Sequence, residues 1–347
     1  MKQQGLFGTY RYALALLVVL AHTGGPELAP WAGTYAVFAF YTLSGYLMTF
    51  VLREVYGTDA VGGIRRFAVN RFLRVFPLYW VVLVITLAVL SMDIEWGAYR
   101  DPAIRMPEDL PHWLVNLTIL GLARGITEFH MSGWRLVMTA WSLHVELSFY
   151  FLMALFFVRR NAIIYFWFLF SLFYTLWILI DGWSWQEHYF PLAAASLPFA
   201  LGSLIYLARK SNKSLHWIVG VFCSVLFVAH ALFSLRIYGD HAQPMQGGFY
   251  VSLMLAVLSV WGLGALARDS GSKISAIDVK LGDLSYPLFL VHPITGMILS
   301  ASLDLGKGFA LFLVTAVAGS FMSWLLHELV EAKVERVRAL VRGKALP

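Results

Sequence analysis

The feature of this sequence that most restricts its fold is a series of long apolar runs with few or no charged residues. Residues 161–180, NAIIYFWFLFSLFYTLWILI, contain no Asp, Glu, Lys or Arg. A helix that crosses the hydrocarbon core of a bilayer needs about 20 mostly apolar residues. The whole chain is 59% hydrophobic and 13% charged, and a water-soluble core cannot hold that much apolar surface. The sequence therefore predicts an all-α polytopic membrane protein.

Ten segments are long and apolar enough to be interpreted as membrane spans. Their approximate bounds are 8–25, 33–52, 76–92, 138–158, 162–180, 189–208, 215–235, 248–267, 284–303 and 308–329. The first segment is short, and the ninth is interrupted by prolines. The apolar segment 112–123 is too short to span, so we interpret it as a surface or re-entrant helix in the longest loop. We expect one membrane domain over residues 1–347, without a fused soluble domain.

The distribution of Lys and Arg indicates how these spans are oriented. If the N-terminus is cytoplasmic, most basic residues fall on the inner side, among them Arg53, Arg160 and Arg209, and few, such as Lys307, fall outside. The positive-inside rule therefore predicts that both termini are cytoplasmic. The basic residues form short groups between apolar runs and not one patch, so nucleic acid is not an expected partner despite the net charge of +6.

Polar side chains inside the spans are rare and costly, which makes them candidates for function. Arg11 and His22 are eleven residues apart, so they share one helix face, about 16 Å apart along the axis. Glu146 lies about two turns into its span, and a buried carboxylate needs a partner. His22 is the partner we expect, because a carboxylate that orients an imidazole is typical of general-base catalysis. The structural alternative is a snorkelling Arg11 and a His22 that only bonds a neighbouring helix.

Ser44 and Gly45 interrupt an aromatic-rich span. Small residues of this kind allow two helices to approach closely, which is the simpler interpretation. The alternative is that Ser44 acts as a nucleophile, although no G-x-S-x-G elbow surrounds it. His144 lies two positions from Glu146 and therefore points away from it on a helix.

Arg71 and Arg74 are three residues apart and so lie on one helix face at the predicted cytoplasmic mouth. An arginine pair suits bidentate phosphate recognition, and the alternative is a topology signal that contacts anionic lipid. His292 lies near mid-membrane between Pro287 and Pro293, where either a structural or a functional histidine fits. No His, Cys or acidic spacing predicts a metal site, and no phosphate-binding or dinucleotide loop is present.

These segments, taken in order, resemble acyltransferase family 3, the integral-membrane O-acyltransferases that modify bacterial surface glycans. The matching segments cover nearly the whole chain. They are RYALALLVVLAH at 11–22, FYTLSGYLMT at 40–49, RFLRVFPLYW at 71–80, WSLHVELSFYF at 141–151, LGDLSYPLFLVHPI at 281–294 and, in weakened form, LVEAKVERV at 329–337.

The resemblance implies a multi-pass protein of the bacterial inner membrane. It implies a cytosolic acyl-CoA donor, most simply acetyl-CoA, and a carbohydrate acceptor, with no permanently bound cofactor. The residues that it places in catalysis are His22, Glu146 and Arg11. Those that it places at the donor site are Arg71, Arg74, Ser44 and Tyr79. The residues that we expect to bind substrate or support the site are Trp141, His144, His292 and Tyr286.

The resulting hypothesis is acyl transfer from acyl-CoA to a sugar hydroxyl, either directly or through an acyl-carrying intermediate, with His22 as the general base. We expect His22, Glu146 and the two arginines to share one water-accessible cleft. The rival hypothesis is a secondary transporter or permease for a glycan or lipid-linked sugar. It would also place His, Glu and Arg in a membrane cavity, but it predicts inverted repeats, of which the sequence shows none.

Overall fold

The computed structural model describes residues 6–57, 61–92, 94, 96, 99–101, 103–122, 135–239, 248–265 and 273–343. These residues form helices and connecting loops, with no β-strand among them. The α-helices are α1 (Phe7–Thr23), α2 (Ala32–Val51), α3 (Val61–Leu90), α4 (Leu110–Thr118), α5 (Ala140–Leu152), α6 (Asn161–Ile180), α7 (Leu192–Lys210), α8 (Trp217–Tyr238), α9 (Phe249–Leu263), α10 (Lys273–Leu303), α11 (Phe309–Leu326) and α12 (Ala332–Val341). Three π-helical segments continue α2, α5 and α11: η1 (Leu52–Tyr56), η2 (Met153–Phe157) and η4 (His327–Glu331).

The prediction of an all-α polytopic membrane protein is confirmed. Within the described residues, eight helices are long and apolar enough to cross a membrane. The other two predicted spans are also helices, but α1 has 17 residues and α9 has 15. Three predicted boundaries are wrong, because α3 begins at Val61, α10 begins at Lys273 and the last helix continues from Phe309 to Val341. All three extensions contain several charged residues, so apolar-run length alone could not detect them.

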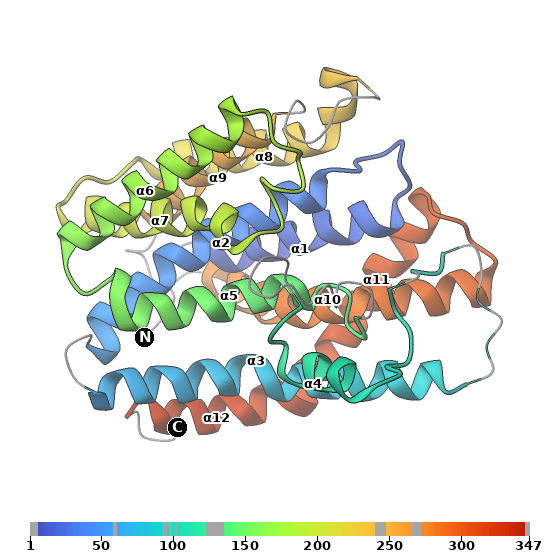
Figure 1. Cartoon of the computed structure of the whole chain (residues 1–347). Coiled ribbons are helices and arrows are strands. Elements are labelled where there is room, and N and C mark those ends of the chain that lie inside the picture. The colour runs from blue at the N-terminus through green and yellow to red at the C-terminus, as the bar shows by residue number, and fades with distance from the viewer. Residues whose placement is uncertain are drawn as a thin grey trace.

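The long helices lie side by side in a bundle (Figure 1). In that view α6, α7, α8 and α9 form the upper part, α1, α2, α5 and α10 the centre, and α3 with α12 the lower part. α1 begins and α12 ends on the same side of the bundle (Figure 1), as an even number of crossings requires. We call this side the terminal end and the opposite side the loop end.

α2 and α7 cross at a pair of glycines. A Cβ atom on Gly45 would collide with the backbone of Phe199, and one on Gly202 would collide with the backbone of Thr42. The predicted role of Gly45 in close helix packing is therefore confirmed. Thr49 and Ser203 continue this contact with a 2.8 Å hydrogen bond between their hydroxyl oxygens.

α10 runs without a break through Pro287 and Pro293. The expected interruption of this span is thus wrong, because neighbouring groups satisfy the backbone. Pro293 cannot donate to the carbonyl of Phe289, four residues earlier. The Thr139 hydroxyl donates to that carbonyl instead, at 3.1 Å. A side chain at the start of α5 thus satisfies the carbonyl that Pro293 leaves free in α10.

α1 is fixed at its first turn by a carboxylate from α10. Asp278 is buried and accepts hydrogen bonds from the backbone nitrogens of Gly8 at 3.1 Å and Thr9 at 2.7 Å. The first amides of a helix lack intrahelical partners and carry partial positive charge, so a carboxylate is favoured there. This contact sets the height of α1 against α10, and with it the heights of Arg11 and His22.

α4 lies in the loop between α3 and α5, which confirms the short helix expected at 112–123. Its first turn is capped by Asp109, which accepts from the His112 backbone nitrogen at 2.9 Å, and this bond holds the pKa of the Asp109 carboxyl below its usual range. The Tyr79 hydroxyl donates to the Asn116 carbonyl and so ties α4 to α3. Most of the loop that follows, residues 123–134, lies outside the described residues.

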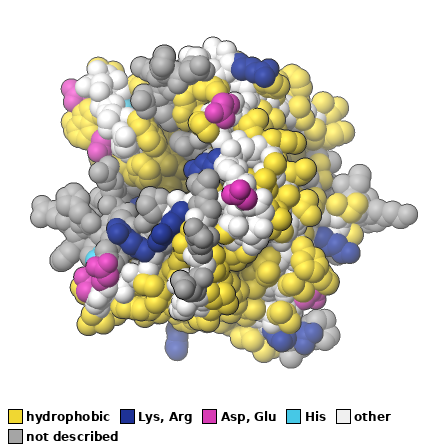
Figure 2. All heavy atoms as spheres, turned by 90° about the vertical axis from the view of Figure 1, so that its right-hand side faces the viewer, with side chains coloured by type: hydrophobic (Ala, Val, Ile, Leu, Met, Phe, Trp, Pro, Cys, Tyr) yellow, Lys and Arg dark blue, Asp and Glu magenta, His cyan; other side chains and the backbone are white. Residues whose placement is uncertain are grey.

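The loop end of the bundle carries acidic and basic side chains scattered among apolar ones (Figure 2). By contrast, many large apolar side chains on the flanks of α6, α8 and α11 are exposed. Examples are Phe166, Phe170, Val225 and Val317. Such a surface is suited to contact with lipid tails and not with water.

Candidate active site

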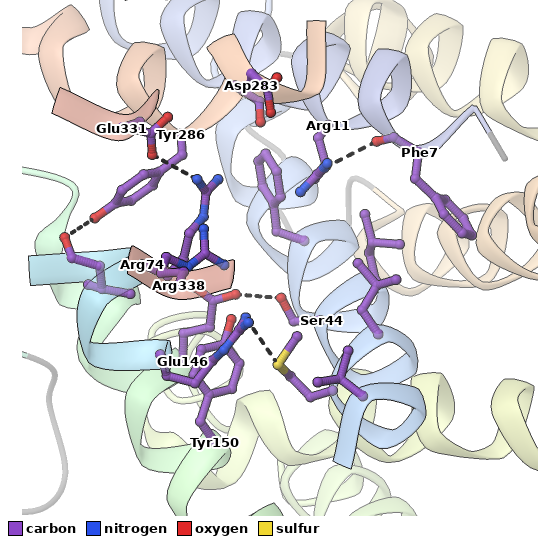
Figure 3. Close-up of a pocket in the computed structure, with 18 of the residues that line it drawn as sticks. Phe7, Arg11, Ser44, Arg74, Glu146, Tyr150, Asp283, Tyr286, Glu331 and Arg338 are labelled. Carbon is purple, nitrogen blue, oxygen red and sulfur yellow. Dashed lines mark hydrogen bonds and ion pairs between the residues drawn. The ribbon is translucent and has the colours of Figure 1, made fainter. Parts of the chain in front are cut away.

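The terminal end of the bundle encloses a cavity with a volume of about 880 Å³. Residues from α1, α2, α3, α5, α10 and α12 line it. Its cationic residues are Arg11, Arg71, Arg74, Arg209, Arg338 and Arg342, and its acidic residues are Glu146, Asp283, Glu331 and Glu335. Arginines thus outnumber carboxylates, which favours an anionic ligand. Figure 3 shows Arg11, Arg74, Glu146 and Arg338 around this common space.

Glu146 is bound by Ser44. The Ser44 hydroxyl donates to Oε1 of Glu146, and both side chains line the cavity (Figure 3). The predicted pairing of Glu146 with His22 is therefore wrong. The Glu146 carboxylate could accept the Ser44 proton, as the alternative of a nucleophilic serine requires. The predicted role of Ser44 at the donor site stays a prediction.

His22 pairs with His292 instead. Nδ1 of His22 lies 2.8 Å from Nε2 of His292, and the two rings are parallel within 7°. His292 is completely buried, whereas His22 is partly exposed. The residue after His22, Thr23, accepts a 2.9 Å hydrogen bond from the Gly308 backbone nitrogen, in the turn between α10 and α11. The histidine pair therefore lies toward the loop end.

The hydrogen bonds of this pair define which nitrogens carry protons. Nδ1 of His292 lies 3.1 Å from the carbonyl oxygen of Leu288, which can only accept. Nδ1 of a neutral His292 therefore carries the proton, and its Nε2 must accept from His22. The proton of His22 is then on Nδ1, and its Nε2 keeps a free lone pair. This is the tautomer that a general base requires.

The predicted single cleft is also wrong, because the cavity stops short of the histidine pair. On α10 the cavity reaches Phe289, and His292 follows one turn later, about 4.5 Å further along the axis. Phe289 contacts Phe40 of α2, with ring centroids 6.0 Å apart, and both rings line the cavity. His22 and His292 are not among the lining residues. The contact between these two rings thus lies in the part of the cavity wall that is nearest to His292 along α10.

Arg71 and Arg74 both line the cavity but have different partners. Nη1 of Arg74 is 2.7 Å from Oε1 of Glu331, and its guanidinium lies over the ring of Tyr286 at 5.2 Å. Nη2 of Arg71 donates to Oδ1 of Asn70 at 3.0 Å. Within the described part of the chain, no carboxylate forms an ion pair with Arg71.

Three predicted residues lie away from the cavity. The Tyr79 side chain is fully buried against α4, so its predicted place at the donor site is wrong. Trp141 packs on Tyr189 with ring centroids 5.0 Å apart. His144 accepts at Nδ1 from the Gly121 backbone nitrogen at 3.0 Å, which agrees with the expectation that it points away from Glu146. Among the supporting residues, Tyr286 lines the cavity and His292 contacts the candidate base.

Several site residues were not predicted. Asp283 and Glu331 line the cavity, and so do Arg338 and Arg342 of α12. Asp283 stands inside the segment LGDLSYPLF, and the other three follow the last apolar run. The charge-rich pattern after position 328 was the only available signal, because nothing local shows that the last helix continues past it and packs against α3.

Together these features define a polytopic membrane protein with an arginine-lined cavity at one end and a hydrogen-bonded histidine pair near the other. Residues 10–328 match the family described as an acyltransferase domain, and the chain belongs to this family. The predicted resemblance to acyltransferase family 3 is thereby confirmed, and the protein is a membrane acyltransferase. No curated protein and no solved structure matches the chain.

Proposed function

We propose that this acyltransferase transfers an acyl group, most simply acetyl, from cytosolic acyl-CoA to a hydroxyl of a cell-surface or exported carbohydrate. The observation that carries the proposal is the cavity with six lining arginines, whose last lining residue on α10 is three positions before the hydrogen-bonded pair of His22 and His292. Family membership favours this enzyme over the alternative of a permease. The proposed location is a bacterial inner membrane, with the terminal end of the bundle in the cytoplasm.

The size and lining of the cavity support a donor of this kind. Pockets for small molecules and cofactors measure about 300–1,000 Å³, and this cavity measures about 880 Å³. The phosphates of CoA would lie at the arginine-rich end, near Arg71 and Arg74. The pantetheine arm would follow the apolar wall formed by α2, at Leu47 and Val51. The thioester would then point toward Phe289 and the histidine pair.

The proposed chemistry uses the free lone pair of His22. Nε2 removes the proton from the acceptor hydroxyl, whose oxygen attacks the thioester carbonyl. The C–O bond forms, the C–S bond breaks, and the imidazolium returns the proton to the leaving thiolate. Arg11 lines the cavity and supplies positive charge for the donor or the developing oxyanion. Because Phe40 and Phe289 lie between donor and base, these rings must move apart during each reaction.

The experiment that tests the function is acyl transfer by purified protein, measured as release of free CoA from acetyl-CoA in the presence of surface glycan. We expect His22→Ala to lower the rate by about 100-fold to 10,000-fold, the range that a general base contributes. His216→Asn is the matched control, since His216 is exposed and caps α8, and Asn preserves a capping side chain.

Wild-type transfer in His22→Ala would exclude His22 as the base. Failure of the wild-type protein to release CoA with any glycan would contradict the proposed reaction itself. Comparison of the mass of the surface glycans with and without the gene would identify the acceptor, because an added acetyl group changes the mass of its repeat unit by a fixed amount.

A further inference from the structure

The C-terminal helix α12 contributes to the cavity although it lies beyond residues 10–328, the part that matches the family. The amide of Asn70 in α3 holds it in place. Asn70 is fully buried, and its Nδ2 donates to the carbonyl oxygen of Arg338 at 3.2 Å. Nη2 of Arg338 in turn donates a hydrogen bond to Oδ1 of Asn70, also at 3.2 Å. The position of Arg338 is therefore built into the packing of α12 on α3.

Asn70 brings two arginines together. The oxygen that accepts from Arg338 also accepts from Nη2 of Arg71 at 3.0 Å. Arg71 and Arg342, as well as Arg74, repel the Arg338 guanidinium electrostatically. A fold that holds like charges this close, with Arg338 only 8% exposed, is stabilised when an anion binds between them.

The carboxylates present do not neutralise this cluster. Glu335 accepts from Nη1 of Arg338 at 2.5 Å and from Nη2 of Arg342, so one carboxylate serves two arginines. The Nε atoms of Arg71 and Arg342 are buried without a hydrogen-bond partner among the described residues. Buried polar atoms normally have partners, so this arginine cluster has fewer hydrogen-bond acceptors than its donors require.

Arg74 differs from Arg71, Arg338 and Arg342 in the burial of its acidic partner. It forms an ion pair with Glu331, and only 8% of the Glu331 side chain is exposed. The other oxygen of Glu331 lies 3.4 Å from Nδ1 of His327. Arg74 and His327 thus hold Glu331 from both sides, at the π-helical turn where α11 passes into α12. This arrangement ties the end of α11 to α3.

We propose that Arg338 and Arg342 of α12 join Arg71 as the phosphate-binding residues of the cavity, and that Arg74 mainly positions α12 through Glu331. The inference rests on the proposed function, because it concerns the phosphates of the acyl-CoA donor. Phosphate binding was expected of Arg71 and Arg74. The proposal assigns the part expected of Arg74 to the arginines of α12, a helix that lies beyond residues 10–328. Guanidinium groups are suited to this role because they donate two parallel hydrogen bonds to phosphate.

The test compares binding of coenzyme A and of pantetheine, which has the same arm but no phosphate, to the purified full-length protein by calorimetry. We expect Arg342→Gln and Arg338→Gln each to weaken coenzyme A binding by about 10-fold to 100-fold, the range for hydrogen bonds to a charged group. Pantetheine binding should stay unchanged. Arg336→Gln is the matched control, because Arg336 is on the same helix but is exposed and does not line the cavity.

The outcomes separate this inference from the proposed function. If the wild type and both variants bind coenzyme A equally, the role of α12 is excluded while acyl transfer remains. Equal loss of coenzyme A and pantetheine would mean that the arginines only shape the cavity, which also overturns the inference. If the wild type binds no coenzyme A, both proposals fail. Thermal unfolding of each variant checks folding, and Arg342→Gln, at a less buried site, decides the question if Arg338→Gln does not fold.

Discussion

At the scale of single residues, the orientation of one imidazole depends on a chain of hydrogen bonds that starts at the backbone. The carbonyl of Leu288 fixes the proton of His292, and His292 in turn fixes the proton of His22. A carboxylate in the same place would also orient the ring, but it would favour the charged imidazolium. A neutral histidine partner keeps His22 neutral and therefore able to accept a proton.

This relay leads to a prediction for His292. His292→Leu removes the acceptor for Nδ1 of His22, and we expect kcat to fall on the order of 100-fold because the base loses its tautomer. The KM for acyl-CoA should change little, since His292 does not line the cavity. His292→Gln, whose carbonyl oxygen can accept from Nδ1, should recover part of kcat. Steady-state kinetics with the two variants would refute the relay if both lost activity equally or if KM alone changed.

At the scale of helices, the site depends on two contacts between elements far apart in the chain. The α2–α7 crossing holds Ser44 beside the cavity, because its neighbour Gly45 lies directly against the backbone of α7 at Phe199. Asp278 of α10 sets the height of α1 through two backbone amides of its first turn. A sliding of either pair by one turn, about 5.4 Å, would remove the polar side chains from the site.

The crossing can be tested with Gly45→Val. The new side chain would meet backbone atoms of Phe199, which cannot rotate away, so we expect destabilisation by about 1–3 kcal/mol and a lower Tm. Gly62→Ala is the control, because a Cβ there meets nothing within 4 Å. Thermal unfolding monitored by tryptophan fluorescence is the measurement. An unchanged Tm in Gly45→Val would show that the two helices are further apart than described.

At the scale of the whole molecule, the bundle has two chemically different ends. The terminal end holds the arginine-lined cavity, and the loop end holds the histidine pair beneath the turn between α10 and α11. The proposed donor and acceptor come from opposite sides of the membrane, and two different ends suit such a pair. Phe40 and Phe289 contact each other in the wall of the cavity.

The orientation of these ends gives a further prediction. In a Cys223→Ser background, a membrane-impermeant maleimide should label Lys307→Cys in intact cells and Lys213→Cys only in inverted vesicles. Both lysines are exposed, and the native Cys223 is buried. The distribution of positive charge is the physical reason for the expected orientation. The reverse labelling pattern would place the arginine-lined cavity outside the cell and would contradict a cytosolic donor.

The approximate position of the apolar helices could be predicted from the sequence because apolar length is a property of each segment alone. Arg71 and Arg74 could also be identified from the sequence, because they stand where an apolar run begins, and so could Gly45 as a helix-contact residue. The prediction failed for the hydrogen-bond partners of buried side chains. Glu146 was matched with His22 because both are polar groups at membrane depth, yet Glu146 lines the cavity and His22 does not.

The sequence by itself determined that the chain is a polytopic helical membrane protein and which polar residues are costly enough to be functional. Only the tertiary structure decided that His22 meets His292, 270 residues away, and that Ser44 meets Glu146. It also decided that α12 continues α11 and packs on α3, which adds arginines to the cavity. The physical reason is that burial cost follows from local composition, whereas hydrogen-bond partners follow from helix heights and rotations that long-range packing sets.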